Sequence, residues 1–184
     1  MKKQLLIFFV PVLFACNNAS SDSETAEDIS LKPQILSTGG HKMPKTWIDS
    51  ATGYTVTRLS PGVDSGSFRS FYFHNYPFVK NKEAEGYKMV CYGNEDNGSQ
   101  LYTINLNNGS MDQLTHQQGK MHGEILARKS GNVYYQIKDS IFSTNAYSGE
   151  TKLVTVFPEN FEASVVSVNE NETLLAGTYS GEVK

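Results

Sequence analysis

Polar and apolar residues alternate along residues 100–115, whose sequence is QLYTINLNNGSMDQLT. Every second side chain of residues 101–106 falls on the same face of an extended strand, and residues 111–114 start a second extended run. Between the runs, Asn107-Asn108-Gly109 supplies residue types that tolerate the positive φ of tight turns. The pattern predicts a β-hairpin.

The same order of strand, polar turn ending in glycine and second strand occurs twice more. Residues 46–60 contain one copy, whose turn ends at Gly53, and residues 141–154 contain the other, whose turn ends at Gly149. Counted from Gly109, the turn glycines lie roughly 56 and 40 residues apart, which brackets the period of about 40 to 50 residues typical of propeller blades. The chain is therefore predicted to repeat one β unit.

The predicted strands form two complete four-stranded blades and the start of a third. An isolated hairpin over residues 46–60 precedes them, as expected of N-terminal strands that complete the final blade of a ring. The strands are an aromatic-rich extended segment at 71–79 with 87–92, 100–106 and 111–115; then 124–127, 133–137, 141–145 and 151–156; then 164–168 and 173–178. We predict an all-β fold, a partial β-propeller of about two and a half blades.

The N-terminal residues predict export and lipid attachment. Residues 1–15 combine two lysines with a short apolar run, which is typical of a signal peptide. The sequence LFAC at residues 13–16 resembles a bacterial lipobox, so Cys16 is the expected lipidation site. Residues 16–41 are expected to form a disordered acidic and polar tether, and residues 42–184 the partial propeller. We expect an exported bacterial lipoprotein of the periplasm or outer membrane, held at the membrane by its lipid.

Composition and missing motifs exclude several classes of function. The net charge of −3 and the lack of a basic cluster argue against nucleic acid as a partner. No HExxH, P-loop, CxxC or nucleophile-elbow motif occurs. If Cys16 carries lipid, Cys91 is the one remaining cysteine, and we interpret it as a small core residue. The four histidines lack the i, i+2 or i, i+4 spacing of metal ligands on one strand or helix face: His41, His74, His116 and His122.

Two segments carry candidate binding chemistry. Residues 69–75 place Arg69, Tyr72 and His74 together: a guanidinium suited to carboxylates, a ring suited to sugar faces, and a titratable imidazole. The alternative is that the aromatic residues pack inside the blade and Arg69 is merely solvated. Residues 116–124 link two blades and could line a central channel, and the alternative there is an ordinary polar loop.

Three segments, taken in order, resemble the N-terminal part of oligogalacturonate lyases, the pectin-degrading polysaccharide lyases built as seven-bladed propellers. The resemblance spans about residues 42–184, and its strongest part pairs a D-x-x-T-G-x-x-V-T-R-L hairpin with an arginine-aromatic segment. The segments are TWIDSATGYTVTRLS at 46–60, RSFYF at 69–73, and QLY at 100–102 with QLT at 113–115. The resemblance implies about two and a half four-stranded blades of a truncated seven-bladed ring.

The resemblance also implies a chemistry. An intact parent would be a carbon–oxygen lyase of pectin catabolism that cleaves short 4-linked galacturonate oligomers or related uronate oligosaccharides by metal-assisted β-elimination. The cofactor would be Mn²⁺ or another divalent metal, with ligands downstream of Lys184, so no catalytic or metal-ligating residue is expected in this chain and it should be inactive alone. The family's histidine before the arginine is Phe68 here. Arg69 is therefore the one family residue carried over, as a uronate-binding residue.

A second class of function is also compatible with these residues. The chain could belong to a non-catalytic propeller lipoprotein, either a TolB-like scaffold or a glycan-binding protein. Short hairpins close to the one at 46–60 are common in TolB-like propellers.

Overall fold

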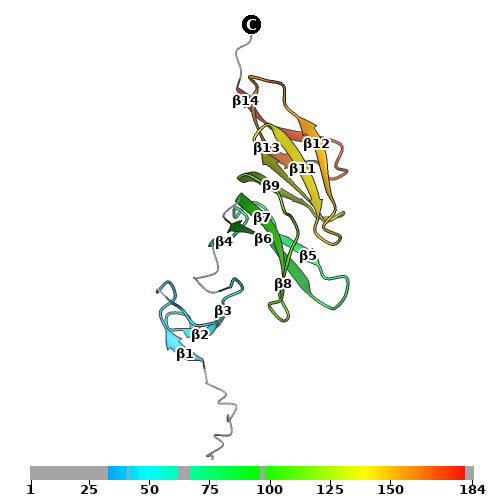
Figure 1. The fold of residues 1–184 in the computed structure, drawn as a ribbon. Helices are drawn as coiled ribbons and strands as arrows, with labels where there is room; N and C mark the ends of the chain where they lie inside the picture. Colours follow the sequence, from blue (N-terminus) through cyan, green and yellow to red (C-terminus); the bar gives the residue numbers. More distant parts are fainter. Residues whose placement is uncertain (1–32, 41, 62–66, 96–97, 181–184) are drawn as a thin grey trace, which may run out of the picture. The chain divides into compact units, whose positions relative to one another are not determined.

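The computed structural model describes residues 33–40, 42–61, 67–95 and 98–180. The chain divides into two compact units, residues 1–32 and 33–184, and the description below concerns the second. Every regular element in the described residues is a β-strand, and the strands form four separate sheets (Figure 1). The described residues contain no helix of the length and apolarity that crossing a membrane requires. The predicted all-β class is confirmed.

The first sheet has three strands and includes the predicted N-terminal hairpin. β2 pairs antiparallel with β3, which confirms the hairpin within residues 46–60. β1 pairs parallel with β2, although its residues fall in the predicted tether of residues 16–41. The prediction was wrong for this strand because its order comes from backbone pairing with residues more than ten positions away. The strands are β1 (Gln34–Leu36), β2 (Thr46–Asp49) and β3 (Thr55–Thr57).

The second sheet is the first blade, and its first strand is split in two. β4 and β5 both pair with β6, β4 with residues 91–94 and β5 with residues 87–89. The predicted extended segment at 71–79 was therefore wrong for residues 71–77, which form a turn between β4 and β5, and right for residues 78–79. The strands are β4 (Ser67–Ser70), β5 (Phe78–Lys80), β6 (Tyr87–Glu95), β7 (Gly98–Asn105) and β8 (Met111–Gln113).

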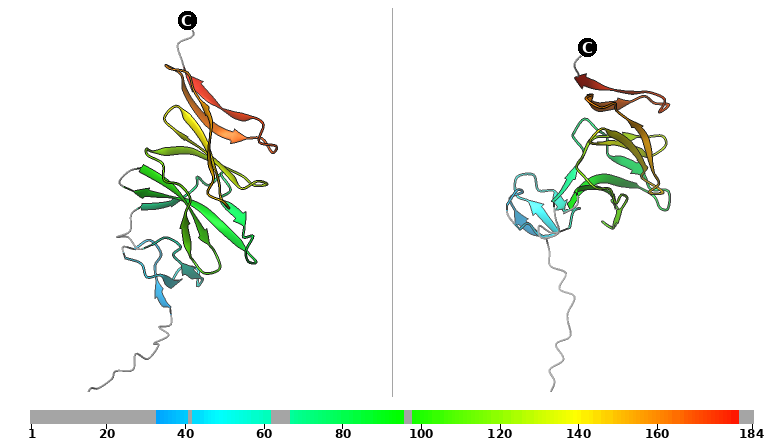
Figure 2. Two further views of the ribbon diagram at one scale, coloured as in Figure 1. Left: turned by 45° about the vertical axis from the view of Figure 1, so that its right-hand side comes forward. Right: turned by 45° about the horizontal axis from the view of Figure 1, so that its top comes forward.

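The remaining two sheets confirm the predicted second blade and the start of a third. The second blade is an antiparallel meander in the order β12-β11-β10-β9, and β13 pairs antiparallel with β14 (Figure 2). The four sheets of the described residues do not close into a ring, which fits a partial propeller. The strands are β9 (Met121–Ala127), β10 (Asn132–Ile137), β11 (Ser140–Asn145), β12 (Thr151–Val156), β13 (Glu162–Val168) and β14 (Leu175–Ser180).

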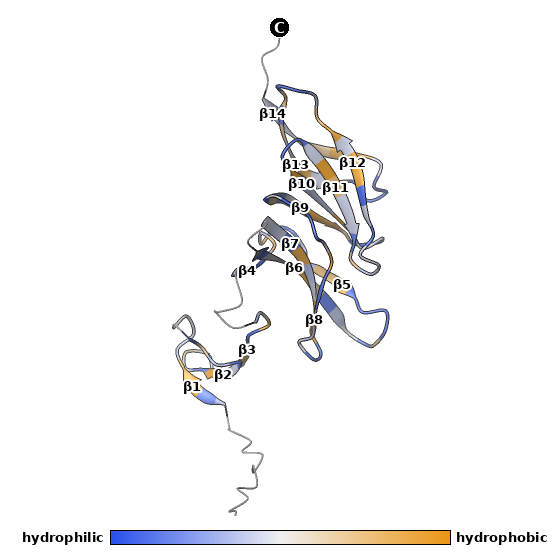
Figure 3. Ribbon diagram, in the orientation of Figure 1, coloured by the Kyte–Doolittle hydropathy of each residue, from blue (hydrophilic) through white to orange (hydrophobic). Residues whose placement is uncertain are grey.

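The core lies on both faces of the first blade. Leu101 belongs to a cluster that joins β6 and β7 to the second blade, where it packs with Val133 and Tyr135. Tyr102 and Ile104, which point to the opposite face of the same strand, belong to a different cluster. This division confirms the two faces predicted from the alternation in residues 101–106. Apolar residues concentrate on the strands, whereas the loops are largely hydrophilic (Figure 3).

The repeated glycine turns have one geometry. Gly53, Gly109 and Gly149 each have φ of 72°. Each donates its N–H to the carbonyl oxygen of the residue four positions earlier, at 2.8, 2.7 and 2.8 Å. That earlier residue has a carboxylate or amide side chain whose oxygen accepts a further backbone N–H, as in an Asx turn: Asp49, Asn105 and Asn145. The sequence signal is therefore both the glycine and the Asp or Asn that precedes it.

Antiparallel pairing sorts the loops of each blade to two ends. The loops after the first and third strands lie at one end, which we call the turn end because it carries the repeated glycine turns at 105–109 and 145–149. The loops after the second strand and the connections between blades lie at the other end, which we call the linker end. β4 lies toward the linker end of the first blade and β5 toward its turn end, because β6 runs from the turn end to the linker end.

Polar contacts join the second and third blades. Glu172 Oε2 accepts hydrogen bonds from Asn132 Nδ2 at 2.8 Å and from the Tyr134 hydroxyl at 2.9 Å. Burial raises the pKa of Glu172, but hydrogen bonds from Ser130, Asn132 and Tyr134 outweigh it, so this pKa lies below its ordinary value. Burial, together with the hydrogen bond to Glu172, raises the pKa of Tyr134 to about 12. Glu172 is therefore a charged anchor between blades.

We predict that acid weakens the first sheet through Asp49. Hydrogen bonds from Thr52 and then Thr38 hold the pKa of Asp49 below its ordinary value of 3.8. A lowered pKa stabilises the fold above the ordinary value, and this stabilisation is lost as the pH falls through the folded-state pKa. The Trp47 indole donates to Thr38 Oγ1 at 3.0 Å, so fluorescence of this single tryptophan reports the network.

The expected result is an acid transition in Trp47 fluorescence below pH 3.8 that Asp49→Asn abolishes or strongly weakens. Asp112→Asn, at an exposed position on β8, is the matched control and should leave the transition unchanged. An identical acid transition in the Asp49→Asn chain would contradict the assignment.

Candidate functional site

The predicted binding segment lies in the turn that interrupts the first strand of the first blade. Asn75 donates its N–H to the Tyr72 carbonyl oxygen at 2.7 Å, which closes the turn. Val90 of β6 then donates to the Pro77 carbonyl oxygen at 2.7 Å, so the chain returns to the sheet before β5. Pro77 has no N–H to offer a ladder, which is consistent with its place at this interruption.

Three neighbouring rings leave the blade at this turn. Tyr72 is 60% exposed, Phe73 is 78% exposed and His74 is exposed. The Tyr72 ring centroid lies 4.5 Å from that of Phe73 and 5.3 Å from that of His74. Phe71, by contrast, is 4% exposed and packs against Tyr92. Interior packing therefore accounts for Phe71 alone, and Tyr72, Phe73 and His74 form an exposed aromatic cluster.

Glu124 of the second blade holds this turn in place. Its Oε1 accepts the Tyr72 N–H at 3.2 Å, and its backbone carbonyl oxygen accepts Asn75 Nδ2 at 2.8 Å. Its Oε2 accepts the Tyr92 hydroxyl at 2.5 Å. One residue of β9 therefore positions a turn that lies about 50 residues earlier in the chain.

Charge is concentrated around the buried Tyr92 hydroxyl. Burial raises the pKa of Tyr92 well above its ordinary range, and the hydrogen bond to the Glu124 carboxylate raises it further, whereas Arg69 lowers it. Arg69 is the cross-strand partner of Tyr92 in the β4–β6 pairing, and its side chain is exposed. In the part of the chain that the structure describes, no carboxylate forms an ion pair with Arg69. Its guanidinium is available to an external carboxylate.

The structure brings two of the three predicted binding residues into direct contact. Tyr72 and His74 meet in the aromatic cluster, and Arg69 is linked to them through Tyr92 and Glu124. Sequence reasoning placed Glu124 at the end of a blade-linking loop and the start of a strand, and it did not single out Tyr92. The available signal was an acidic residue directly before the apolar run 125–127, which needs a partner when it is partly buried.

The predicted second segment, residues 116–124, is bound to the first blade by hydrogen bonds in its first half. Gln100 is buried, its Oε1 accepts the Gln117 N–H at 3.0 Å, and its Nε2 donates to the Gln117 carbonyl oxygen at 2.5 Å. Gly119 forms a backbone bridge with Gly98 of β7. Residues 116–120 therefore fit the alternative prediction of a structural polar loop, whereas residues 121–124 belong to β9.

The histidines do not converge within the described residues. His74 lies in the aromatic cluster, whereas His116 Nδ1 lies 3.2 Å from Gln113 Nε2 in the blade connection. His122 is exposed on β9, and His41 lies outside the described residues. No group of three or more His, Cys, Asp or Glu side chains in the described ranges could hold a metal ion.

The remaining predicted positions have structural roles or lie outside the described residues. Cys91 is 2% exposed, and burial raises the pKa of its thiol to about 12, which confirms it as a small core residue. Phe68 packs edge-on against Tyr102 at 5.2 Å between ring centroids. Phe68, directly before Arg69, is therefore half-buried against the core. The signal peptide and Cys16 lie outside the described residues.

Comparisons with known proteins support the fold resemblance. No protein-family model and no curated protein matches the sequence. The structure is similar to a crystal structure of oligogalacturonate lyase from Vibrio parahaemolyticus, with a TM-score of 0.61 and 22% identity over 74% of this chain. It is also similar to an oligogalacturonate lyase in complex with manganese, with a TM-score of 0.62 and 20% identity over 82% of this chain. The chain spans 35% and 39% of the lengths of those two chains. The predicted resemblance is confirmed for the fold.

We predict that Glu124→Ala destabilises the fold and loosens the binding turn. The substitution leaves the buried Tyr92 hydroxyl and the Tyr72 N–H without their acceptor, which costs about 1 to 3 kcal/mol of unfolding free energy. Urea unfolding followed by circular dichroism measures this loss, and amide hydrogen exchange at Tyr72 and Asn75 should accelerate.

The matched control is Glu83→Ala, which removes an exposed glutamate that pairs with Lys88 at 3.5 Å. It is expected to change the unfolding free energy by less than about 0.5 kcal/mol. Equal effects of the two substitutions would refute the anchoring role of Glu124.

Proposed function

We propose that this chain forms the first blades of an oligogalacturonate lyase-like propeller, whose intact parent cleaves short 4-linked galacturonate oligomers by β-elimination. One observation carries the proposal. The first strand of the first blade is interrupted by a turn, and an exposed arginine before the turn and an exposed aromatic cluster within it lie close together in the chain. The similarity of the fold to two oligogalacturonate lyases supports the choice of substrate class. Because those similarities are at 20–22% identity, they support the fold, and the substrate class is inferred from the exposed residues and the fold together.

The proposed role of these residues is to bind and orient the uronate. Arg69 forms two parallel N–H···O bonds with a carboxylate, which fixes the orientation of the sugar. Tyr72 and Phe73 offer ring faces to the apolar side of a sugar ring. Glu124 and Tyr92 act indirectly, because they hold the turn that carries these rings.

In this proposal the described residues bind the substrate and take no part in breaking its glycosidic bond. β-Elimination removes a proton next to a carboxylate, and a cation beside the carboxylate stabilises the developing negative charge. One of the similar structures contains manganese, but the described residues have no cluster that fits such an ion. No step through a metal is therefore assigned to these residues.

A second candidate function uses the same site without cleavage. The exposed rings and Arg69 would equally serve a glycan-binding propeller. The two functions differ in the product of the intact parent, which is an unsaturated uronate only for the lyase.

We further propose that the chain is an exported lipoprotein anchored through Cys16. The support is the LFAC sequence at the end of a short apolar run that follows Lys2 and Lys3. A lipid on Cys16 would place the uronate site outside the cytoplasm, where pectin fragments enter a bacterium.

We predict that Arg69→Gln weakens binding of trigalacturonate about tenfold, because one charge-assisted contact is lost. Isothermal titration calorimetry of the 184-residue chain measures the affinity. Lys152→Gln, at an exposed position on β12, is the control and should retain parental affinity. Unchanged binding by Arg69→Gln would refute the proposed site.

The same chain, supplied with trigalacturonate and manganese, is expected to give no increase in ultraviolet absorbance from an unsaturated product. A measured increase would contradict the division of roles, since the described residues would then belong to a complete catalytic unit.

We predict that Cys16→Ser moves the chain expressed in a Gram-negative host from the detergent phase to the aqueous phase in a cloud-point extraction. The cause is loss of the thiol that accepts the lipid. Cys91→Ser is the control and should remain in the detergent phase, and equal partitioning of both variants would exclude lipidation at Cys16.

A further inference from the structure

A groove with a volume of about 900 Å³ opens at the turn end of the blades, separate from the uronate site. Its walls come from the loops that follow the first strand of three successive blades, at Lys80–Lys82, Arg128–Lys129 and Asn169–Glu170. Neither Arg69, Tyr72 nor His74 lines it. The uronate-binding residues lie at positions 69–74, whereas on the first blade the groove is lined from Tyr76 onward, by β5 and the loop that follows it.

The groove is basic in a protein whose net charge is −3. Its lining among the described residues includes four cationic side chains and one anionic side chain, Glu170. Glu170 pairs with Lys129 at 2.7 Å, which leaves Lys80, Lys82 and Arg128 without a neutralising carboxylate in the described part of the chain. An anionic ligand is therefore the complementary partner.

Aromatic rings hold two of these cations without neutralising them. Lys82 Nζ lies 3.7 Å from the centroid of the Tyr147 ring, and Arg128 Cζ lies 4.2 Å from that of Tyr76. Such cation–π contacts favour a defined position for the charge and leave its hydrogen-bond donors available. Tyr76 and Tyr87 remain 41% and 43% exposed, so ring surface is also open at the groove.

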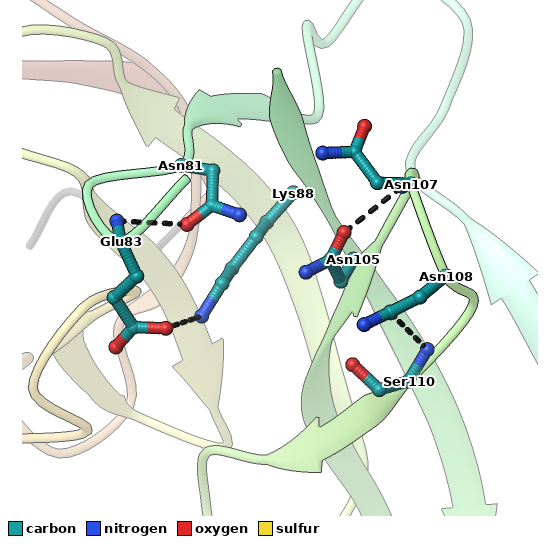
Figure 4. Close-up of polar contacts among 7 residues, drawn as sticks. All are labelled: Asn81, Glu83, Lys88, Asn105, Asn107, Asn108 and Ser110. Atoms are coloured by element: carbon teal, nitrogen blue, oxygen red, sulfur yellow. Dashed lines mark hydrogen bonds and ion pairs between the residues drawn. The ribbon is translucent and has the colours of Figure 1, made fainter. Parts of the chain in front are cut away.

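The groove wall is ordered by specific packing. Gly131 has φ of 80°, and a Cβ atom there would lie 2.5 Å from Cε2 of Tyr147, so only glycine allows this ring position. On the first blade, Glu83 donates its N–H to Asn81 Oδ1, and its carboxylate pairs with Lys88 (Figure 4). The charge of Lys88 is therefore neutralised by Glu83. Asn81 Nδ2 is a buried donor that finds no acceptor among the described residues, and it belongs to a residue of the groove wall.

We infer that this groove is a second binding site, selective for an acidic saccharide whose carboxylates contact Lys82 and Arg128. Cations alone would suit any anion, but the exposed Tyr87 ring adds a surface for a sugar face, and the volume holds several sugar units. The inference does not depend on the proposed function, because it uses none of the residues of the uronate site.

The experiment titrates trigalacturonate into the Arg69→Gln chain and follows backbone amide signals by nuclear magnetic resonance. Saturable shifts are expected at Lys80–Lys82 and Arg128–Lys129. The double substitution Lys82→Gln with Arg128→Gln should weaken this binding at least tenfold, and higher salt should weaken it in the parent groove. Lys152→Gln is the matched control and should change the affinity less than twofold.

Three results would overturn the inference. These are the absence of saturable shifts at the groove, equal affinity for a neutral 4-linked trigalactose, and unchanged affinity in the double variant. Inorganic sulfate that binds as tightly as trigalacturonate would likewise overturn the saccharide assignment, leaving a general anion site. The parent chain repeats the titration, since residue-specific signals separate the groove from the uronate site. Failure at one site therefore leaves the other intact.

Discussion

The structure depends on burial of one blade face against the next. Val90 and Leu101 of the first blade and Val133 of the second are fully buried in one shared cluster. Burial of such a side chain contributes about 1.5 to 3 kcal/mol each, and neither sheet could bury that face alone. Backbone pairing forms each sheet, but packing between sheets sets how the first strand of one blade lies relative to the first strand of the next. Both the proposed uronate site and the groove use residues from more than one blade, so both depend on this packing.

The proposed uronate site shows how this packing positions candidate binding residues. The turn at 72–75 belongs to the first blade, while the Glu124 carboxylate and carbonyl that hold it belong to the second. If the blades separated, the turn would lose these contacts and the Tyr92 hydroxyl would lose its acceptor. The position of this turn is therefore coupled to interblade stability. The groove at the turn end has the same dependence, because its walls come from three blades.

The third blade shows the other side of the same constraint. Val166, Leu174 and Tyr179 are 58%, 69% and 66% exposed. Phe161 stacks on Tyr179 at 5.0 Å between ring centroids, yet it is itself 37% exposed. Apolar strands with this exposure fit a blade whose outer face has no neighbour among the described residues.

The sequence alone determined most of the strands, their faces and the repeated turns. Alternation with period two is a local property, and an Asp or Asn followed four residues later by glycine specifies a turn through its own backbone, as at Asn105 and Gly109. The arginine and aromatic residues of the uronate site were equally visible, because residue type alone suggests their chemistry. Burial of Cys91 also followed from its apolar strand.

The tertiary structure alone decided what these residues contact. The break at residues 71–77, the pairing of β1, the anchoring by Glu124 and the basic groove all join residues distant in sequence. Whether a side chain is buried, as Phe71 is, or exposed, as Phe73 is, depends on which neighbouring blade covers it. Local patterning cannot encode that cover, because it comes from the sum of many weak contacts between separate sheets.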